Sequence, residues 1–306
     1  MVAQNFEPAL ACVNVHEGGK DDDKRDPGGR TAYGVTQARY NQYLRDKGRP
    51  RADVWGITVP ERVEIWRTYY WDVMHCDDLP AGLDYVVFDG GVNSGPAQSV
   101  KWLQRAINDV RAKTGDSPIL VDGQMGTNTV VAANALDDTD AVIAAMQDRR
   151  LAMLKALRTW SVYSKGWGRR VADVRKLGQA VARGSVPLKP PPGWTTAPGK
   201  ALPTDAKPLP SPDKGTLAAG VGGASSAVST ATTAIQPAQG ISTTLDVVLN
   251  VLIVLGVALT LAGAGYAWWA NRRAKQLRAD LDLAPSPTPD NGNEPVHPVA
   301  APGEAA

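Results

Sequence analysis

The sequence predicts a mainly α-helical protein, followed by a flexible proline-rich linker and one C-terminal membrane helix. Apolar residues recur at helical spacing through most of residues 1–183, whereas alternating strand patterns are scarce. Nine prolines fall within residues 187–212, a density that favours an extended spacer over a packed core. The run from Val251 to Ala270 carries no charge, and about 20 such residues are needed to cross a bilayer.

The N-terminal segment predicts a helix that ends at a carboxylate. Phe6, Leu10 and Val13 lie along one helical stripe that leads to Glu17. The run GGKDDDKRDPGGRT that follows contains glycines, a proline and charges, so it predicts a loop or a small hairpin. The carboxylate is therefore expected at the junction between an apolar helix and a loop.

Capping residues mark two further helices. Thr36 precedes a helical run that Gly48 should stop. Thr58 begins a capping pattern before a helix over residues 58–72. Helical periodicity returns in residues 91–183, which we expect to form a second helical half or to complete one compact body.

Charge and cysteine content limit the classes of function. The chain has 33 Lys and Arg against 31 Asp and Glu, a net charge of +2. This balance is too weak to indicate a nucleic-acid partner, which needs a clustered basic face. Cys12 and Cys76 are expected to be buried free thiols, and neither they nor the histidines have the spacing of a zinc site. We expect no metal and no cofactor.

A carboxylate pair is the candidate chemistry of this chain. A carboxylate at the end of an apolar helix is partly desolvated, which should raise the pKa of Glu17 toward that of a useful general acid. Gly18 and Gly19 would leave room for a sugar beside it. Asp26 follows nine residues after Glu17 and could face it across a cleft, and cleavage of a glycosidic bond needs such a pair.

Polar side chains after the loop extend this candidate site. The hydroxyls of Thr31 and Thr36 and the amide of Gln37 could position water or the N-acetyl group of a sugar. From spacing alone, two interpretations stay open. Glu17 is either a general acid or a surface charge at a helix end that precedes a turn.

Several sequence blocks follow one another in a fixed order. They are HEGG, DPGGRTAYGVTQ and IWRTYYWD, followed by FDGGVNSGPAQSVKWLQRAI and VDGQMGTNTVVA. This order of motifs resembles glycoside hydrolase family 108, a lysozyme-like family common in phages and prophages. The resemblance implies a lysozyme-like catalytic domain at residues 1–90 and a predicted peptidoglycan-binding region at 91–183. A linker would then occupy 184–244. The Asp122 turn of the second region also fits a purely structural role, so wall binding by that region is one of two open interpretations.

The family implies an N-acetylmuramidase, which cuts the bond between N-acetylmuramic acid and N-acetylglucosamine in bacterial peptidoglycan. The implied catalytic residues are Glu17, Asp26 and Thr31. Asp21, Asp22 and Asp23 compete with Asp26, so the second role stays open. We expect substrate contacts from Gly18, Gly19, Tyr33, Thr36 and Gln37.

Two other functions remain compatible with these residues. One is a non-catalytic, membrane-anchored protein that binds peptidoglycan or assists secretion. The other is a related enzyme that acts on a different amino-sugar polymer, such as chitin. For the muramidase, the expected role is lysis of a host cell or remodelling of its wall.

The predicted membrane helix occupies residues 245–270 and makes the lipid bilayer an expected partner. Trp268 and Trp269 lie near one end, where interfacial aromatics are common, and the basic run NRRAKQLR follows. Basic residues favour the cytoplasmic side, so the catalytic region should face the periplasm or cell wall from the bacterial inner membrane. Residues 271–306 are expected to be a basic and then disordered tail.

Overall fold

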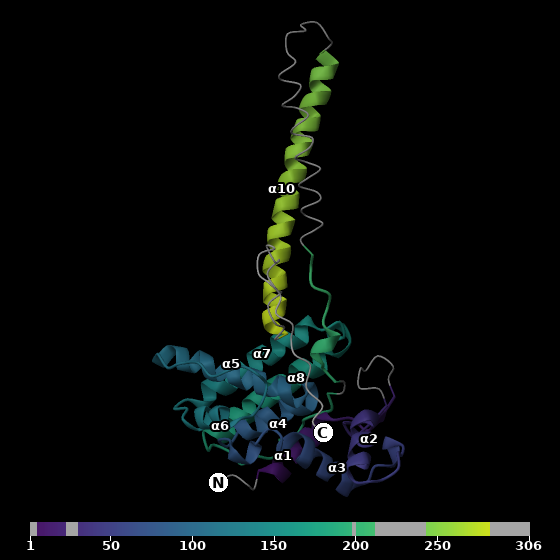
Figure 1. The fold of residues 1–306 in the computed structure, drawn as a ribbon, viewed down its shortest axis with the longest axis vertical. Coiled ribbons are helices and arrows are strands. Elements are labelled where there is room, and N and C mark those ends of the chain that lie inside the picture. The colour runs from purple at the N-terminus through teal and green to yellow at the C-terminus, as the bar shows by residue number, and fades with distance from the viewer. Residues whose placement is uncertain (1–4, 23–29, 198–199, 212–242, 282–306) are drawn as a thin grey trace, which may run out of the picture.

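The computed structural model describes residues 5–22, 30–197, 200–211 and 243–281 (Figure 1). Within these ranges the protein is mainly helical, as the sequence predicts, and its strands are short. Figure 1 shows most helices gathered in one body, with a single long helix projecting from it.

The N-terminal part joins an apolar helix to a small sheet. Helix α1 (Phe6–His16) buries one stripe of apolar side chains, as predicted. Strands β1 (Lys20–Asp21), β2 (Thr31–Ala32) and β3 (Val35–Thr36) form an antiparallel sheet in that order. The sheet confirms the hairpin that the glycine-rich run indicates.

Local capping chemistry starts the next two helices where the sequence predicts. Helix α2 (Gln37–Asp46) follows Thr36, whose hydroxyl accepts a backbone hydrogen bond in the first turn. Helix α3 (Val59–Trp66) begins with a capping box between Thr58 and Glu61. The shorter helical segments of the described residues are the 3-10 turns η1 (Val54–Gly56), η3 (Cys76–Asp78) and η4 (Pro203–Asp205) and the π-helix η2 (Arg67–Trp71), which directly follows α3.

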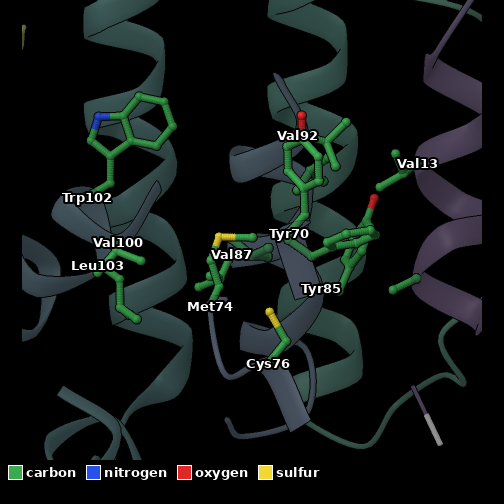
Figure 2. Packing of buried hydrophobic residues seen from close by; sticks show 14 of the residues in the cluster. Val13, Tyr70, Met74, Cys76, Tyr85, Val87, Val92, Val100, Trp102 and Leu103 are labelled. Carbon is green, nitrogen blue, oxygen red and sulfur yellow. The ribbon is translucent and has the colours of Figure 1, made fainter. Parts of the chain in front are cut away.

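Helix α4 (Leu83–Ser94) lies at the centre of the body. All of its residues are buried, and it contacts α1, α5, α7 and α8. Figure 2 shows side chains from α1, α4 and α5, including Val13, Val87 and Trp102, in one apolar cluster. The expected boundary at residues 90–91 therefore falls inside a buried helix that both regions share. The other helices are α5 (Pro96–Thr114), α6 (Thr127–Asn134), α7 (Thr139–Ala156) and α8 (Trp160–Ala182).

The two cysteines are buried free thiols, as predicted. Cys12 lies in α1 and Cys76 in η3, and they are not bonded to each other. Burial raises the pKa of Cys12 to about 12 and that of Cys76 well above its ordinary value. Both thiols therefore stay protonated at neutral pH and are poor nucleophiles.

The described part of the expected linker, residues 184–197 and 200–211, packs against the body. The described residues of this segment form no regular element longer than η4. Its packing differs from the prediction, since small side chains such as Ala197 and Ala201 are buried and their backbone N–H groups bond to the helices. Composition indicates an extended backbone but not whether that backbone finds partners.

Helix α10 (Thr243–Asp280) extends away from the body, and its C-terminal end lies against the body (Figure 1). Leu277 and Leu281 are buried there, and α10 contacts α7. The rest of the expected linker, 212–242, and the tail from residue 282 lie outside the described residues.

The expected membrane helix at 245–270 is not supported. Among the residues whose side chains are described, no helix is long and apolar enough to cross a bilayer. Seven glycines and alanines between residues 256 and 267 supply little apolar surface to this part of α10. The side chains of residues 243–253 lie outside the described set.

Candidate active site

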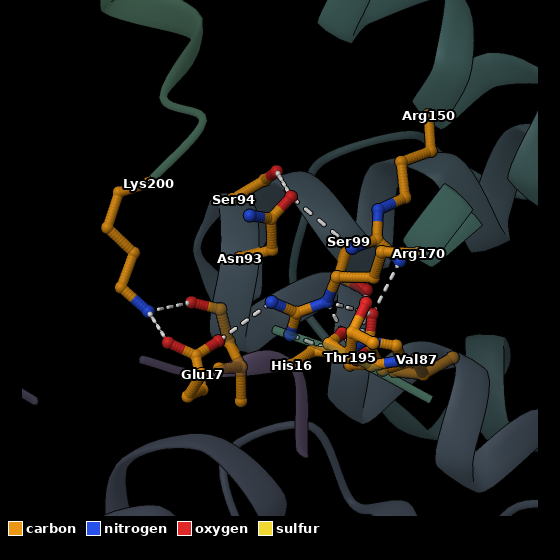
Figure 3. A network of polar contacts seen from close by, with 12 residues as sticks. His16, Glu17, Val87, Asn93, Ser94, Ser99, Arg150, Arg170, Thr195 and Lys200 are labelled. Atoms are coloured by element: carbon orange, nitrogen blue, oxygen red, sulfur yellow. Dashed lines mark hydrogen bonds and ion pairs between the residues drawn. The ribbon is translucent and has the colours of Figure 1, made fainter. Parts of the chain in front are cut away.

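Glu17 lies where the sequence predicts, directly after α1. Its backbone N–H donates to the carbonyl oxygen of Val13 at 3.1 Å, which closes the last turn of the helix. Its side chain turns into the body and is only 9% exposed. The candidate acid is thus held at a fixed point on the surface of the core (Figure 3).

Two cations contact the Glu17 carboxylate. Arg170 Nη1 donates to Oε1 at 2.9 Å, and Lys200 Nζ donates to Oε2 at 3.3 Å (Figure 3). Burial alone would raise the pKa of Glu17, but Lys200 and Arg170 together hold it below its ordinary value. The sequence predicts a raised pKa, and that prediction is wrong for the described state. The two cations could not be foreseen from the local sequence, because both come from segments far along the chain.

A buried carboxylate fixes Arg170. Asp89 on α4 is fully buried and lies 2.9 Å from Arg170 Nη2 and 2.7 Å from Arg150 Nη1. Burial would raise the pKa of Asp89, but Arg170 and Arg150 hold it far below its ordinary value. Positive and negative groups alternate from Arg150 through Asp89 and Arg170 to Glu17, so each charge in this part of the core has an opposite neighbour.

The turn between β2 and β3 forms one wall around Glu17. Tyr33 and Gly34 both have positive φ, 51° and 81°. A Cβ atom on Gly34 would lie 2.8 Å from Cδ and 2.9 Å from Cγ of Glu17. Such distances are too short for nonbonded carbons, so the turn approaches the carboxylate only with glycine at this position.

We expect Gly34→Ala to lower both stability and activity. The positive φ alone should cost about 1 kcal/mol, and the new methyl group must also displace Glu17. Gly48→Ala is the matched control, because Gly48 has a φ of 66° but open space around a Cβ atom. Urea unfolding should show the larger loss for Gly34→Ala, and only that variant should lose hydrolysis. Equal losses in both variants would contradict the close approach.

The similarity to known proteins includes the part of the chain that forms this site. The profile of the family described as Glycosyl hydrolase 108 matches residues 10–95, which include Glu17 and the hairpin. A solved structure of SagA from Brucella abortus is similar, with 36% sequence identity and a TM-score of 0.51, over 59% of this chain and 97% of that chain. The chain belongs to glycosyl hydrolase family 108. No curated protein sequence matches it.

Family 108 is a family of glycoside hydrolases, and several predicted site residues of this member gather near its hairpin. Thr31 is buried in β2. Gly18 and Gly19 connect α1 to β1, and the carbonyl oxygen of Gly19 accepts a hydrogen bond from Tyr33 N–H at 2.9 Å. Asp26 lies outside the described residues. Its role as the second carboxylate stays a prediction.

Thr36 and Gln37 have structural partners in this family 108 chain. The Thr36 hydroxyl caps α2. The Gln37 amide donates to Asn41 Oδ1 at 2.9 Å and to the carbonyl oxygen of Ala52 at 2.8 Å. Its oxygen accepts from Val54 N–H at 2.9 Å. Substrate contacts from Thr36 and Gln37 stay predictions, and they would have to share these bonds.

Four charged residues of the site are not predicted from the sequence: Asp89, Arg150, Arg170 and Lys200. Arg150 and Arg170 lie on the buried stripes of α7 and α8, among apolar neighbours. A charge within an apolar helical stripe is a signal that could have identified them, because an unpaired charge is seldom buried. The pattern does not say which carboxylate each would meet.

The predicted wall-binding turn has a sufficient structural explanation. Gln104 on α5 donates to Asp122 Oδ1 at 2.8 Å and to Thr129 Oγ1 at 3.1 Å, and its oxygen accepts from Gly123 N–H at 2.9 Å. A cavity of about 670 Å³ opens beside this turn, between α5 and α6. Wall binding here stays a prediction.

His16 should make stability depend on pH. Burial lowers its pKa to about 4, so the folded protein holds it neutral. In the unfolded chain, the histidine binds a proton with a pKa near 6.5. The contribution of neutral His16 to the free energy of unfolding is therefore complete above that pH and should be about 2 kcal/mol smaller at pH 5. Urea unfolding at pH 7 and 5 should show this loss in the wild type but not in His16→Gln. Comparing the two proteins cancels the opposite effect of Asp84, whose pKa burial raises to about 6. Equal pH dependence in both proteins would contradict the assignment.

Proposed function

We propose that the protein is a peptidoglycan hydrolase of the N-acetylmuramidase type with Glu17 as the general acid. The observation that carries this proposal is the position of Glu17, almost buried at the end of α1 and fixed by Arg170, within the segment matched by the family. Cleavage of a glycosidic bond requires such a group to protonate the leaving oxygen.

In the proposed mechanism, Glu17 gives its proton to the oxygen that links N-acetylmuramic acid to N-acetylglucosamine. The carboxylate left behind would be stabilised by Arg170, whose guanidinium lies 2.9 Å from Oε1. Asp26 is proposed as the base or electrostatic stabiliser on the other face of the sugar, and Thr31 as the residue that positions water. Arg170 is a positioning residue, because it acts through Glu17.

The proposed substrate places the protein at the bacterial cell wall, with a role in host lysis or wall remodelling. This location rests on the substrate class. Gly18, Gly19 and Tyr33 are proposed substrate contacts, since they lie between the end of α1 and the hairpin turn.

Product analysis of purified sacculi tests the proposal. The full chain is incubated with sacculi, the soluble products are reduced with borohydride, and the reduced sugar is identified by mass spectrometry. We expect reduced N-acetylmuramic acid at the new ends. Reduced N-acetylglucosamine would indicate cleavage of the other bond, and release from chitin alone would indicate a different polymer.

A non-catalytic wall-binding protein is the second candidate, because the described state holds Glu17 ionised and covered. Such a protein would sediment with sacculi and release no reducing sugar under any condition. Sedimentation and sugar release measured on the same sample separate the two functions.

A further inference from the structure

The segment after α8 crosses the candidate active site and brings a lysine to the acid. We call residues 194–197 and 200–206 the strap. Lys200 Nζ lies 3.3 Å from Glu17 Oε2 and donates at 2.8 Å to the carbonyl oxygen of Val92. Lys200 is only 8% exposed, and lysine is seldom this buried unless its charge is paired.

Backbone hydrogen bonds fasten the strap on both sides of Lys200. The N–H of Ala197 donates to the carbonyl oxygen of His16 at 2.8 Å, one residue before the acid. The N–H of Ala201 donates to the carbonyl oxygen of Asn93 at 3.0 Å, near the end of α4. The strap therefore runs across the site from α1 to α4.

An aromatic contact holds the first residues of the strap against the end of α1. The Trp194 ring lies 4.7 Å from the His16 ring, between centroids. The carbonyl oxygen of Thr195 lies 3.3 Å from His16 Nδ1. Ionic, backbone and ring contacts of the strap thus meet at the end of α1. Together they favour a specific bound position of the strap over an incidental contact.

We propose that the strap is an intramolecular ligand of the site at Glu17 and blocks the acid while it is bound. The inference rests on the proposed function, because blocking matters only if Glu17 is the acid. Gly34, Arg170 and Lys200 lie against the carboxylate, and the Glu17 side chain is only 9% exposed. Arg170 lies in helix α8 and is fixed through Asp89, whereas Lys200 lies on a segment without regular secondary structure, so the strap is the part that can leave.

The bound strap also opposes the chemistry of the acid. A general acid must carry a proton before it can donate one. Lys200 and Arg170 hold the pKa of Glu17 low, against the effect of burial. The bound strap therefore covers most of the carboxylate, and its lysine helps Arg170 to keep Glu17 ionised.

An engineered disulfide can lock the strap in the full chain. A Cβ atom on Gly166 in α8 would lie 3.6 Å from the Cβ of Ala197, within the range of about 3.5–4.5 Å found in disulfides. The native Cys12 and Cys76 are buried and should not compete. Gly166→Cys with Ala197→Cys should form the bond, detected by mass spectrometry as the loss of two free thiols.

Hydrolysis of sacculi is then compared before and after reduction. We expect the oxidised double variant to be at least about tenfold less active than the reduced one, since a covalent lock removes the open state. Each single cysteine variant serves as a control and should not respond to reductant. Failure of the disulfide to form would overturn the docking of the strap. Equal activity of the oxidised and reduced forms would overturn the block and leave the proposed function intact.

Substitution of the lysine gives a second, independent readout. Lys200→Met should raise the activity of the full chain, because the buried pair that holds the strap is lost. Lys207→Met is the matched control, since Lys207 Nζ is exposed and bonds to the carbonyl oxygen of Lys155. A fall in activity for Lys200→Met would overturn the inference. Inactivity of the reduced lock and of Lys200→Met together would overturn the proposed function, and the block with it.

Discussion

Glu17→Gln should lower the rate of sacculus hydrolysis by about 10²- to 10⁴-fold, the contribution expected of a general acid. The amide cannot donate an acidic proton to the leaving oxygen. The fold should survive, because Arg170 keeps its contact with Asp89. The initial rate of reducing-end release is the measurement, with thermal unfolding to confirm that the variant is folded.

Glu7→Gln is the matched control for this prediction. Glu7 lies in the first turn of α1 and is exposed, so the change removes the same charge from the same helix without touching the site. Its rate should equal that of the wild type. A rate for Glu17→Gln close to that of Glu7→Gln would remove Glu17 from the mechanism.

Asp89→Asn should be the most destabilising single change in the ionic network, with a loss of about 3–5 kcal/mol in the free energy of unfolding. Asp89 balances the buried guanidiniums of Arg150 and Arg170, and the amide leaves both without a carboxylate partner at that position. Activity should also fall, because Arg170 loses the contact that aims it at Glu17.

Asp109→Asn is the control variant, because it removes the carboxylate of an exposed ion pair instead of a buried one. Asp109 pairs with Arg149 at 2.8 Å, but its side chain is 45% exposed, so its loss should cost at most about 1 kcal/mol. Urea unfolding of both variants at pH 7 gives the comparison. Similar losses for Asp89→Asn and Asp109→Asn would mean that the buried network does not support the fold.

The parts of the fold that the sequence predicts are those set by neighbouring residues. Thr36 and Thr58 mark helix starts, because a capping hydroxyl acts within one turn. The end of α1 at Glu17 follows from an apolar stripe and the glycines after it. These features need no knowledge of distant segments.

The electrostatic surroundings of the site could not be predicted in this way. Arg170 is 153 positions from Glu17 in sequence, and Lys200 is 183 positions away. The local pattern gave only the effect of burial on the carboxyl pKa, and the distant cations reverse that effect. Similarly, the prolines before Lys200 predict an extended backbone. The position at which this segment binds the body depends on carbonyl groups at the ends of α1 and α4.

The most direct test of the account is the fate of solvent oxygen during digestion of sacculi by the full chain in H₂¹⁸O. Hydrolysis with Glu17 as the acid predicts one ¹⁸O at each new reducing N-acetylmuramic acid, and almost none of this product from Glu17→Gln. Products closed internally without ¹⁸O, or labelled ends released by Glu17→Gln at the wild-type rate, would contradict it.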